Sequence, residues 1–205
     1  ASMIELFFNE FLSTFPFHIL ACVPFHKKLR HSPWKTFLWV CEFELGYLLL
    51  FLFLIQIGLS SVWVQYLALP CFGVLFKLIV DAESGMILFL YLFIIDYLLV
   101  VRAAAFCICQ ALFGYNFFSW ETGLVTFLLV LCSIYFMAKA MTRTVEGLSS
   151  VSIPSFWNTA WLLPASVTLI LLLLTGNIRS GTITVAALLA RFMLLICMFL
   201  ISHFM

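Results

Sequence analysis

The sequence predicts an all-α protein, a bundle of transmembrane helices that crosses the bilayer several times. Of the chain's 205 residues, 65% are hydrophobic and only 9% are charged, whereas soluble domains are about one quarter charged. Apolar runs recur from end to end, and each is long enough for the ~20 helical residues that cross a hydrocarbon core. Because these runs lack the alternation of a membrane barrel, the spanning unit is the helix.

We expect about seven spans in a single domain over residues 1–205. The predicted helices are Met3–Phe25, Trp34–Ile57, Val62–Val80, Met86–Leu112, Trp120–Thr142, Ser155–Thr175 and Thr182–Met205. The connections between them read, in order, HKKLRHSP, GLSS, DAESG, FGYNFFS, RTVEGLSSVSIP and GNIRSG. Their glycine, proline, serine, asparagine and aspartate residues are typical of turns. None of these connections is long enough to hold a folded soluble domain.

The first predicted helix differs from the others because it carries Glu5, Glu10 and several hydroxyl side chains. It either crosses the membrane or lies along its outer surface as an amphipathic helix, which would leave six spans. The second to fifth helices and the seventh are predominantly apolar runs of spanning length. The sixth follows Ser152 and Pro154, a cap and a proline that favour a helix start. Prolines inside three predicted helices should kink them. These are Pro16, Pro70 and Pro164.

The distribution of positive charge predicts the orientation. If alternate connections share one side, that side carries most of the lysines and arginines near helix ends. These are Lys27, Lys28, Arg30, Lys35, Lys77, Lys139 and Arg143, and the opposite side has Arg179. The positive-inside rule makes the rich side cytoplasmic, so we expect the N-terminus outside and the C-terminus in the cytoplasm.

Ionisable side chains inside the predicted spans are the main candidates for function. They are Glu5, Glu10, Asp96, Arg102, Glu121 and Arg191. Such a group costs roughly 2.5–3.5 kcal/mol at the bilayer centre, so it should face the bundle and find a partner. Most of these residues fall in the outer half of the spans, which predicts a polar chamber open to the outside. The alternative is that they form pairs, Asp96–Arg102 or Glu10–Arg191, that only lock helices together.

The spacing of residues along a helix predicts which way several of the ionisable side chains point. Asp96 and Arg102 lie about 240° apart around one helix, so we expect them to meet partners on different spans. Glu42 and Glu44 point in nearly opposite directions from the second helix. Lys77 lies near the inner end of the third helix. Its ammonium group is within reach of Glu42 if the Lys77 side chain extends along the membrane.

Two further observations concern ligands and catalysis. Trp120 closes an outer aromatic stretch, FGYNFFSW, that is suited to an apolar or aromatic ligand. No metal, nucleotide or hydrolase motif is present, and the seven cysteines contain no CxxC pair. We therefore expect no metal, no cofactor and no catalytic activity, and the net charge of +1 predicts no nucleic-acid partner. His18 and Cys22, four residues apart, leave a membrane cysteine peptidase as an alternative.

Four segments together resemble the membrane-sensor half of Agr-type, peptide-pheromone-receptor histidine kinases of the GHKL group. They are ELFFNEFLSTFPFHILACVPFHKKLRHSPWKT, IIDYLLVVRAAAF, SFWNTAWLLPA and LLARFMLLICMFLISHFM. The resemblance implies a bacterial cell-membrane sensor that binds an extracellular ligand, often a small cyclic peptide, and passes a helix movement inward. It also implies that the chain is truncated before a cytoplasmic kinase through which two copies would form a homodimer.

Other functions remain open from the residues alone. Short connections, proline-interrupted helices and intramembrane charges also suit a small transporter, or the membrane subunit that captures substrate for one. A purely structural or assembly role is the remaining alternative. In every case the lipid bilayer is the first partner of the chain.

Overall fold

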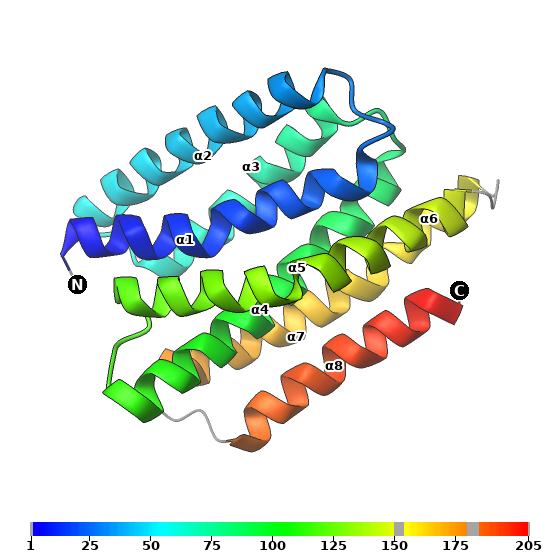
Figure 1. Cartoon of the computed structure of the whole chain (residues 1–205). Coiled ribbons are helices and arrows are strands. Elements are labelled where there is room, and N and C mark those ends of the chain that lie inside the picture. The colour runs from blue at the N-terminus through cyan, green and yellow to red at the C-terminus, as the bar shows by residue number, and fades with distance from the viewer. Residues whose placement is uncertain (1, 150–153, 180–184, 205) are drawn as a thin grey trace.

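The computed structural model describes residues 2–149, 154–179 and 185–204. Its regular elements are α1 (Met3–Cys22), the 3-10 turn η1 (Val23–Phe25), α2 (Pro33–Gln56), α3 (Ser61–Ile79), α4 (Ser84–Phe113), α5 (Trp120–Ser149), α6 (Pro154–Ala160), α7 (Leu162–Arg179) and α8 (Val185–Phe204). Figure 1 shows the long helices running back and forth, with the N- and C-termini at opposite ends of the bundle. Helix is the regular structure throughout the described residues, so the predicted all-α fold is confirmed.

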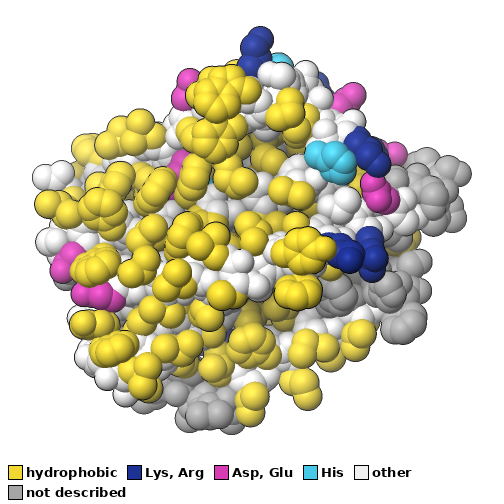
Figure 2. All heavy atoms as spheres, in the orientation of Figure 1, with side chains coloured by type: hydrophobic (Ala, Val, Ile, Leu, Met, Phe, Trp, Pro, Cys, Tyr) yellow, Lys and Arg dark blue, Asp and Glu magenta, His cyan; other side chains and the backbone are white. Residues whose placement is uncertain are grey.

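Five helical stretches are long and apolar enough to cross a membrane. They are Met3–Phe25, Pro33–Gln56, Ser84–Phe113, Trp120–Gly147 and Phe156–Leu173. Two shorter apolar stretches come from α3 and α8, Pro70–Ile79 and Ala187–Met198. The face drawn in Figure 2 is covered by hydrophobic side chains across its middle, far beyond the apolar patches that soluble proteins expose. The chain is therefore a multi-pass membrane protein.

Helix α1 is packed with its polar side inward. Asn9, Glu10, Thr14 and His18 are buried, while Phe8 on the same helix is exposed. A helix in water would reverse this arrangement, but hydrocarbon solvates the apolar face and leaves the polar face to find partners within the protein. α1 contacts α2, α4 and α5, so it is an integral part of the bundle.

Helix α4 occupies the centre of the bundle. It contacts α1, α3, α5, α6, α7 and α8, and buried side chains occur along nearly its whole length. Ala103 and Ala105 are completely buried, because their small side chains allow neighbouring helices to come close. Charges placed on α4 consequently face other helices rather than lipid.

The sixth predicted helix is divided in two, contrary to the continuous Ser155–Thr175 that the apolar run predicted. α6 ends at Ala160 and α7 begins at Leu162. Pro164 explains the break, because a proline nitrogen cannot donate to the carbonyl four residues earlier and its ring crowds that carbonyl. Pro16 and Pro70, by contrast, lie within continuous helices.

Some predicted boundaries also shift. α5 continues to Ser149, past the predicted end at Thr142, because the end of an apolar run is not a signal that stops a helix. The predicted cap Ser152 and the predicted helix start at Thr182 lie outside the described residues.

The α1–α2 and α3–α4 connections meet at one end of the bundle. The backbone amide of Arg30 donates to the carbonyl of Ile79 at 2.9 Å, and Lys27 forms an ion pair of 2.8 Å with Glu146 near the end of α5. Figure 2 shows lysine and arginine side chains gathered towards this end, at the upper right of the view.

Helices α1 and α5 pack closely against each other at Gly123. A Cβ atom added to Gly123 would lie 2.7 Å from the Cα atom of Asn9, a distance that real Cβ atoms do not tolerate. This close approach holds the polar side of α1 against the start of α5.

We expect Gly123→Ala to lower the stability of the purified protein by about 1–3 kcal/mol, because α1 must move away from α5. Thermal unfolding in detergent measures the effect. Gly73→Ala on α3 is the matched control, since its added Cβ meets nothing within 4 Å. Equal melting temperatures for the two variants would contradict the close packing of α1 on α5.

Candidate functional site

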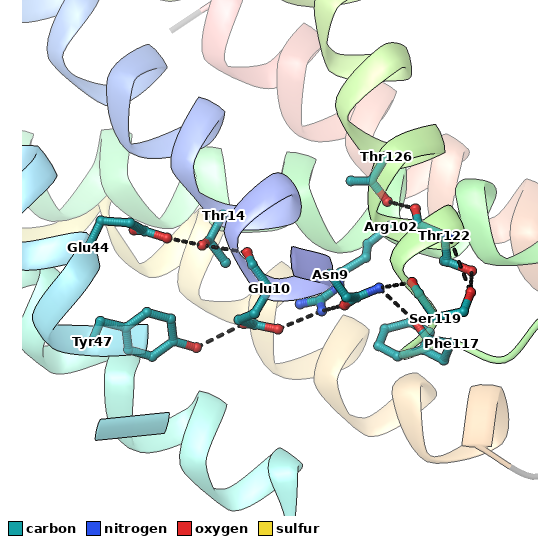
Figure 3. A network of polar contacts seen from close by, with 10 residues as sticks. All are labelled: Asn9, Glu10, Thr14, Glu44, Tyr47, Arg102, Phe117, Ser119, Thr122 and Thr126. Atoms are coloured by element: carbon teal, nitrogen blue, oxygen red, sulfur yellow. Dashed lines mark hydrogen bonds and ion pairs between the residues drawn. The ribbon is translucent and has the colours of Figure 1, made fainter. Parts of the chain in front are cut away.

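Polar side chains from α1, α2, α4 and the start of α5 meet inside the bundle and form what we call the buried polar network (Figure 3). Its members are Asn9, Glu10, Thr14, His18, Glu44, Tyr47, Arg102, Ser119, Thr122 and Thr126, and the backbone of Phe117 takes part. The network joins segments up to 110 residues apart in the sequence.

The centre of the network is an ion pair between Glu10 of α1 and Arg102 of α4. An Nη2 atom of Arg102 lies 2.7 Å from Oε2 of Glu10 and 2.8 Å from Oδ1 of Asn9. The Tyr47 hydroxyl donates to the other carboxylate oxygen of Glu10 at 2.8 Å. Glu10 is 1% exposed and Arg102 is 6% exposed. Because water is excluded, each charge depends on these partners.

A second pair lies deeper along α1. His18 Nδ1 is 2.7 Å from Oε2 of Glu44, and the Thr14 hydroxyl contacts Oε1 of the same carboxyl group. The His18 ring stacks on Phe72 of α3 with 3.6 Å between the ring centroids. The prediction that Glu42 and Glu44 point in opposite directions is confirmed, because Glu44 is buried in the bundle and Glu42 is exposed.

His18 is thus engaged by a carboxyl group rather than by a thiol. The Cys22 Sγ atom instead contacts the backbone carbonyl of His18 at 3.5 Å. The thiol–imidazole pair that the spacing of these two residues had left open is not formed in this arrangement.

The network extends to one end of the bundle through Asn9. The Asn9 side chain donates to the carbonyl oxygens of Ser119 at 2.6 Å and of Phe117 at 3.2 Å. Ser119 in turn caps α5, since its hydroxyl accepts from the amide of Thr122 at 3.3 Å. The Arg102 guanidinium lies over the Phe117 ring, 5.0 Å from its centroid. Asn9 and Arg102 both contact the α4–α5 connection. A movement of this connection would therefore displace the ion pair directly.

Asp96 lies apart from the network and joins α4 to α7. Its Oδ1 atom is 2.5 Å from the Thr168 hydroxyl, which is also 2.8 Å from the carbonyl of Pro164. A hydroxyl has one proton, so if Thr168 donates to the carbonyl, Asp96 must donate to Thr168. Among the described residues, the other carboxyl oxygen is buried without a hydrogen-bond partner, which is costly for an ionised carboxylate. With Asp96 as the donor, both contacts of the Thr168 hydroxyl are accounted for. Asp96 and Arg102 reach different helices, as their spacing predicted.

Arg191 of α8 is 1% exposed and lies near Cys107 of α4. Its Nε and Nη1 atoms are buried and have no hydrogen-bond partner among the described residues. The lock between Glu10 and Arg191 considered from the sequence is wrong, because Glu10 pairs with Arg102. Arg191 thus retains unused donors in this conformation.

The remaining predicted residues lie outside the network. Glu5 forms an exposed capping box with Ser2 at the start of α1. Glu121 and Trp120 begin α5, where Glu121 is partly buried and Trp120 is exposed. Lys77 donates to the carbonyl of Ala82 at 3.0 Å, so the predicted approach to Glu42 is not seen.

Sequence reasoning missed the central roles of Asn9, Thr14, His18 and Tyr47. A signal for part of the network was present, because Glu10, Thr14 and His18 recur every four residues and so share one helix face. The tyrosine carries no comparable signal, since aromatic residues are abundant throughout the chain.

A cavity of about 70 Å³ lies beside the ion pair, lined by Glu10, His18, Tyr47, Tyr91 and Arg102 among others. It has room for a few water molecules and is far smaller than the ~300–1,000 Å³ of typical ligand sites. Across the described part of the chain, no cluster of three or more His, Cys, Asp or Glu residues is arranged to hold a metal ion.

Comparison of the chain with known protein families, with characterised proteins and with solved structures found no match.

We expect Arg102→Met to destabilise the folded protein by about 3–5 kcal/mol, because Glu10 is left buried without its counter-charge. The double variant Glu10→Met/Arg102→Met should recover part of that loss, since no charge then remains unpaired. Thermal unfolding in detergent gives both values, with Glu5→Gln on the same helix as control, since Glu5 is only partly buried and lies outside the network. Strictly additive losses would contradict a coupled pair.

Asp96→Asn should change the stability by no more than about 1 kcal/mol, because an amide keeps the shape of a protonated carboxyl and can donate to Thr168. Asp96→Ala should cost more, since it removes the donor and leaves a cavity. If the amide variant unfolds as readily as the alanine variant, Asp96 is not held as a neutral donor.

Proposed function

We propose that the chain is a signal-receiving domain of a bacterial cell membrane, with seven crossings, its N-terminus outside and its C-terminus in the cytoplasm. The opposite positions of the two termini support an odd number of crossings (Figure 1). The gathering of lysine and arginine at the end that holds the α1–α2 connection supports a cytoplasmic position for that end. The α4–α5 connection then lies on the outside.

The observation that carries this proposal is the buried Glu10–Arg102 pair and its link to the outer connection through Asn9. Ionised groups inside a membrane bundle are expensive and are retained mainly where they have a function. This pair holds three helices and one outer connection in a single arrangement. A ligand that competes for its donors and acceptors would favour a second arrangement, which is a population shift.

The ligand in this proposal is a small extracellular molecule, such as a peptide, that binds at the outer end of the bundle. The cavity beside Arg102 is too small for a peptide, so binding requires the outer ends of the helices to separate. The buried donors of Arg191 are unused in the arrangement seen here, and this favours a ligand that carries carboxylate or carbonyl groups. α8, on which Arg191 lies, would then transmit the movement inward to a kinase region and its dimer partner.

We expect fluorescent small cyclic peptides, screened on proteoliposomes, to include ligands that bind from the outside. For such a ligand, Arg191→Ala and Arg102→Lys should each weaken binding by at least about tenfold, because hydrogen bonds to a charged group are lost or misaligned. Lys77→Ala at the opposite end of the bundle is the control. Unchanged affinity in both arginine variants would remove these residues from the binding site.

A small transporter is the second candidate, favoured by the break between α6 and α7 beside Pro164. Interrupted helices and a buried carboxyl such as Asp96 are typical of transport sites near the middle of the membrane. Substrate uptake by proteoliposomes that contain only this chain distinguishes transport from sensing.

A further inference from the structure

Helix α3 is flanked by a groove on each side. The α2–α3 groove has a volume of about 480 Å³ and is lined by Trp39, Phe43, Gly46, Leu50, Leu67 and Cys71 among others. The α3–α4 groove, lined by Gly73, Lys77 and Ile87 among others, has about 570 Å³. Both volumes fall in the ~300–1,000 Å³ range of ligand sites. Their walls are mainly apolar, so each groove suits a hydrocarbon chain.

The α2–α3 groove shares a wall with the cavity of the buried polar network. Tyr47 and Ala68 line both spaces. Phe72 of α3 stands at this wall, with its ring 5.1 Å from the Tyr47 ring and stacked on His18. Tyr47 and Ala68 therefore form a wall shared by an apolar groove and a polar cavity, with Phe72 packed beside Tyr47 on the cavity side.

The cavity behind this wall contains unused hydrogen-bonding groups. Within the described part of the chain, the Tyr91 hydroxyl and the Arg102 Nε atom are buried and have no hydrogen-bond partner, and both residues line the cavity. Tyr91 is 5% exposed. Groups of this kind normally find a partner, so the cavity suits a molecule that brings a hydrogen-bond acceptor.

The carboxyl groups around the cavity already have partners. Glu10 pairs with Arg102, and Glu44 is hydrogen-bonded to His18 and Thr14 (Figure 3 shows the acidic side chains). An added anion or cation would be left without a counter-charge in a desolvated space. The fitting head group is consequently uncharged and carries a carbonyl or hydroxyl oxygen.

We propose that the α2–α3 groove binds an uncharged, single-chain amphiphile of the monoacylglycerol type that enters from the bilayer. Its acyl chain lies along the groove, and its head passes Phe72 to reach Tyr91 and Arg102. This site concerns binding alone and stands whether the protein senses or transports.

A monoacylglycerol with a photoreactive diazirine in its chain tests the site in lipid nanodiscs. After illumination, peptide mapping should find the label concentrated on α2 and α3, and unlabelled monoacylglycerol should displace it. A lysophosphatidate and an alkylammonium of the same chain length should compete at least about tenfold more weakly, which corresponds to one unmatched polar contact. Uniform labelling of lipid-facing helices, or equal competition by all three compounds, would overturn the proposal.

Two glycines provide matched variants, because an added Cβ meets nothing within 4 Å at either position. Gly46→Leu fills the α2–α3 groove and should abolish the displaceable label. Gly73→Leu fills the α3–α4 groove and should leave it unchanged. The opposite result would place the acyl chain in the α3–α4 groove and overturn this site.

Tyr91→Phe tests the head group separately. The hydroxyl has no hydrogen-bond partner among the residues that the structure describes, so the variant should fold normally and bind the monoacylglycerol about fivefold to tenfold more weakly. Unchanged binding would show that the head does not reach the cavity.

Discussion

The ion pair between Glu10 and Arg102 is the constraint on which the rest of the structure depends. Two charges that are almost completely buried in a membrane bundle require each other and every nearby polar group. This requirement turns the polar face of α1 inward, sets the rotation of α2 so that Tyr47 reaches Glu10, and holds the α4–α5 connection against Asn9. The apolar faces of these helices are then left for lipid.

The helices differ in how they are held in place. α1 is fixed by ionic and hydrogen-bonded contacts that have few alternative arrangements, whereas the described contacts of α3 with its neighbours are mainly apolar and aromatic, centred on Phe72. Apolar contacts are non-directional, so they tolerate small displacements better than a buried ion pair does. The helix that is held mainly by apolar contacts is thus also the one that the two grooves flank.

Some features of the site followed from helical periodicity alone. The divergence of Asp96 from Arg102 and of Glu42 from Glu44 depends only on positions around one helix, and both predictions agree with the structure. Predictions that joined two helices fared worse. Lys77 does not reach Glu42, and Glu10 pairs with Arg102 rather than Arg191. The break at Trp161 was also missed, because the apolar run around Pro164 continues through it.

Composition by itself determined the solvent and the class of fold. An abundance of Leu, Phe and Ile with very few charges can be accommodated only by apolar helices in a bilayer, and this conclusion needs no knowledge of contacts. Only the tertiary structure decided which charges meet. The rotation and depth of each helix relative to its neighbours result from packing over the whole bundle, and a single sequence does not record them. The partnership of Tyr47 with Glu10 and of His18 with Glu44 arises at that level.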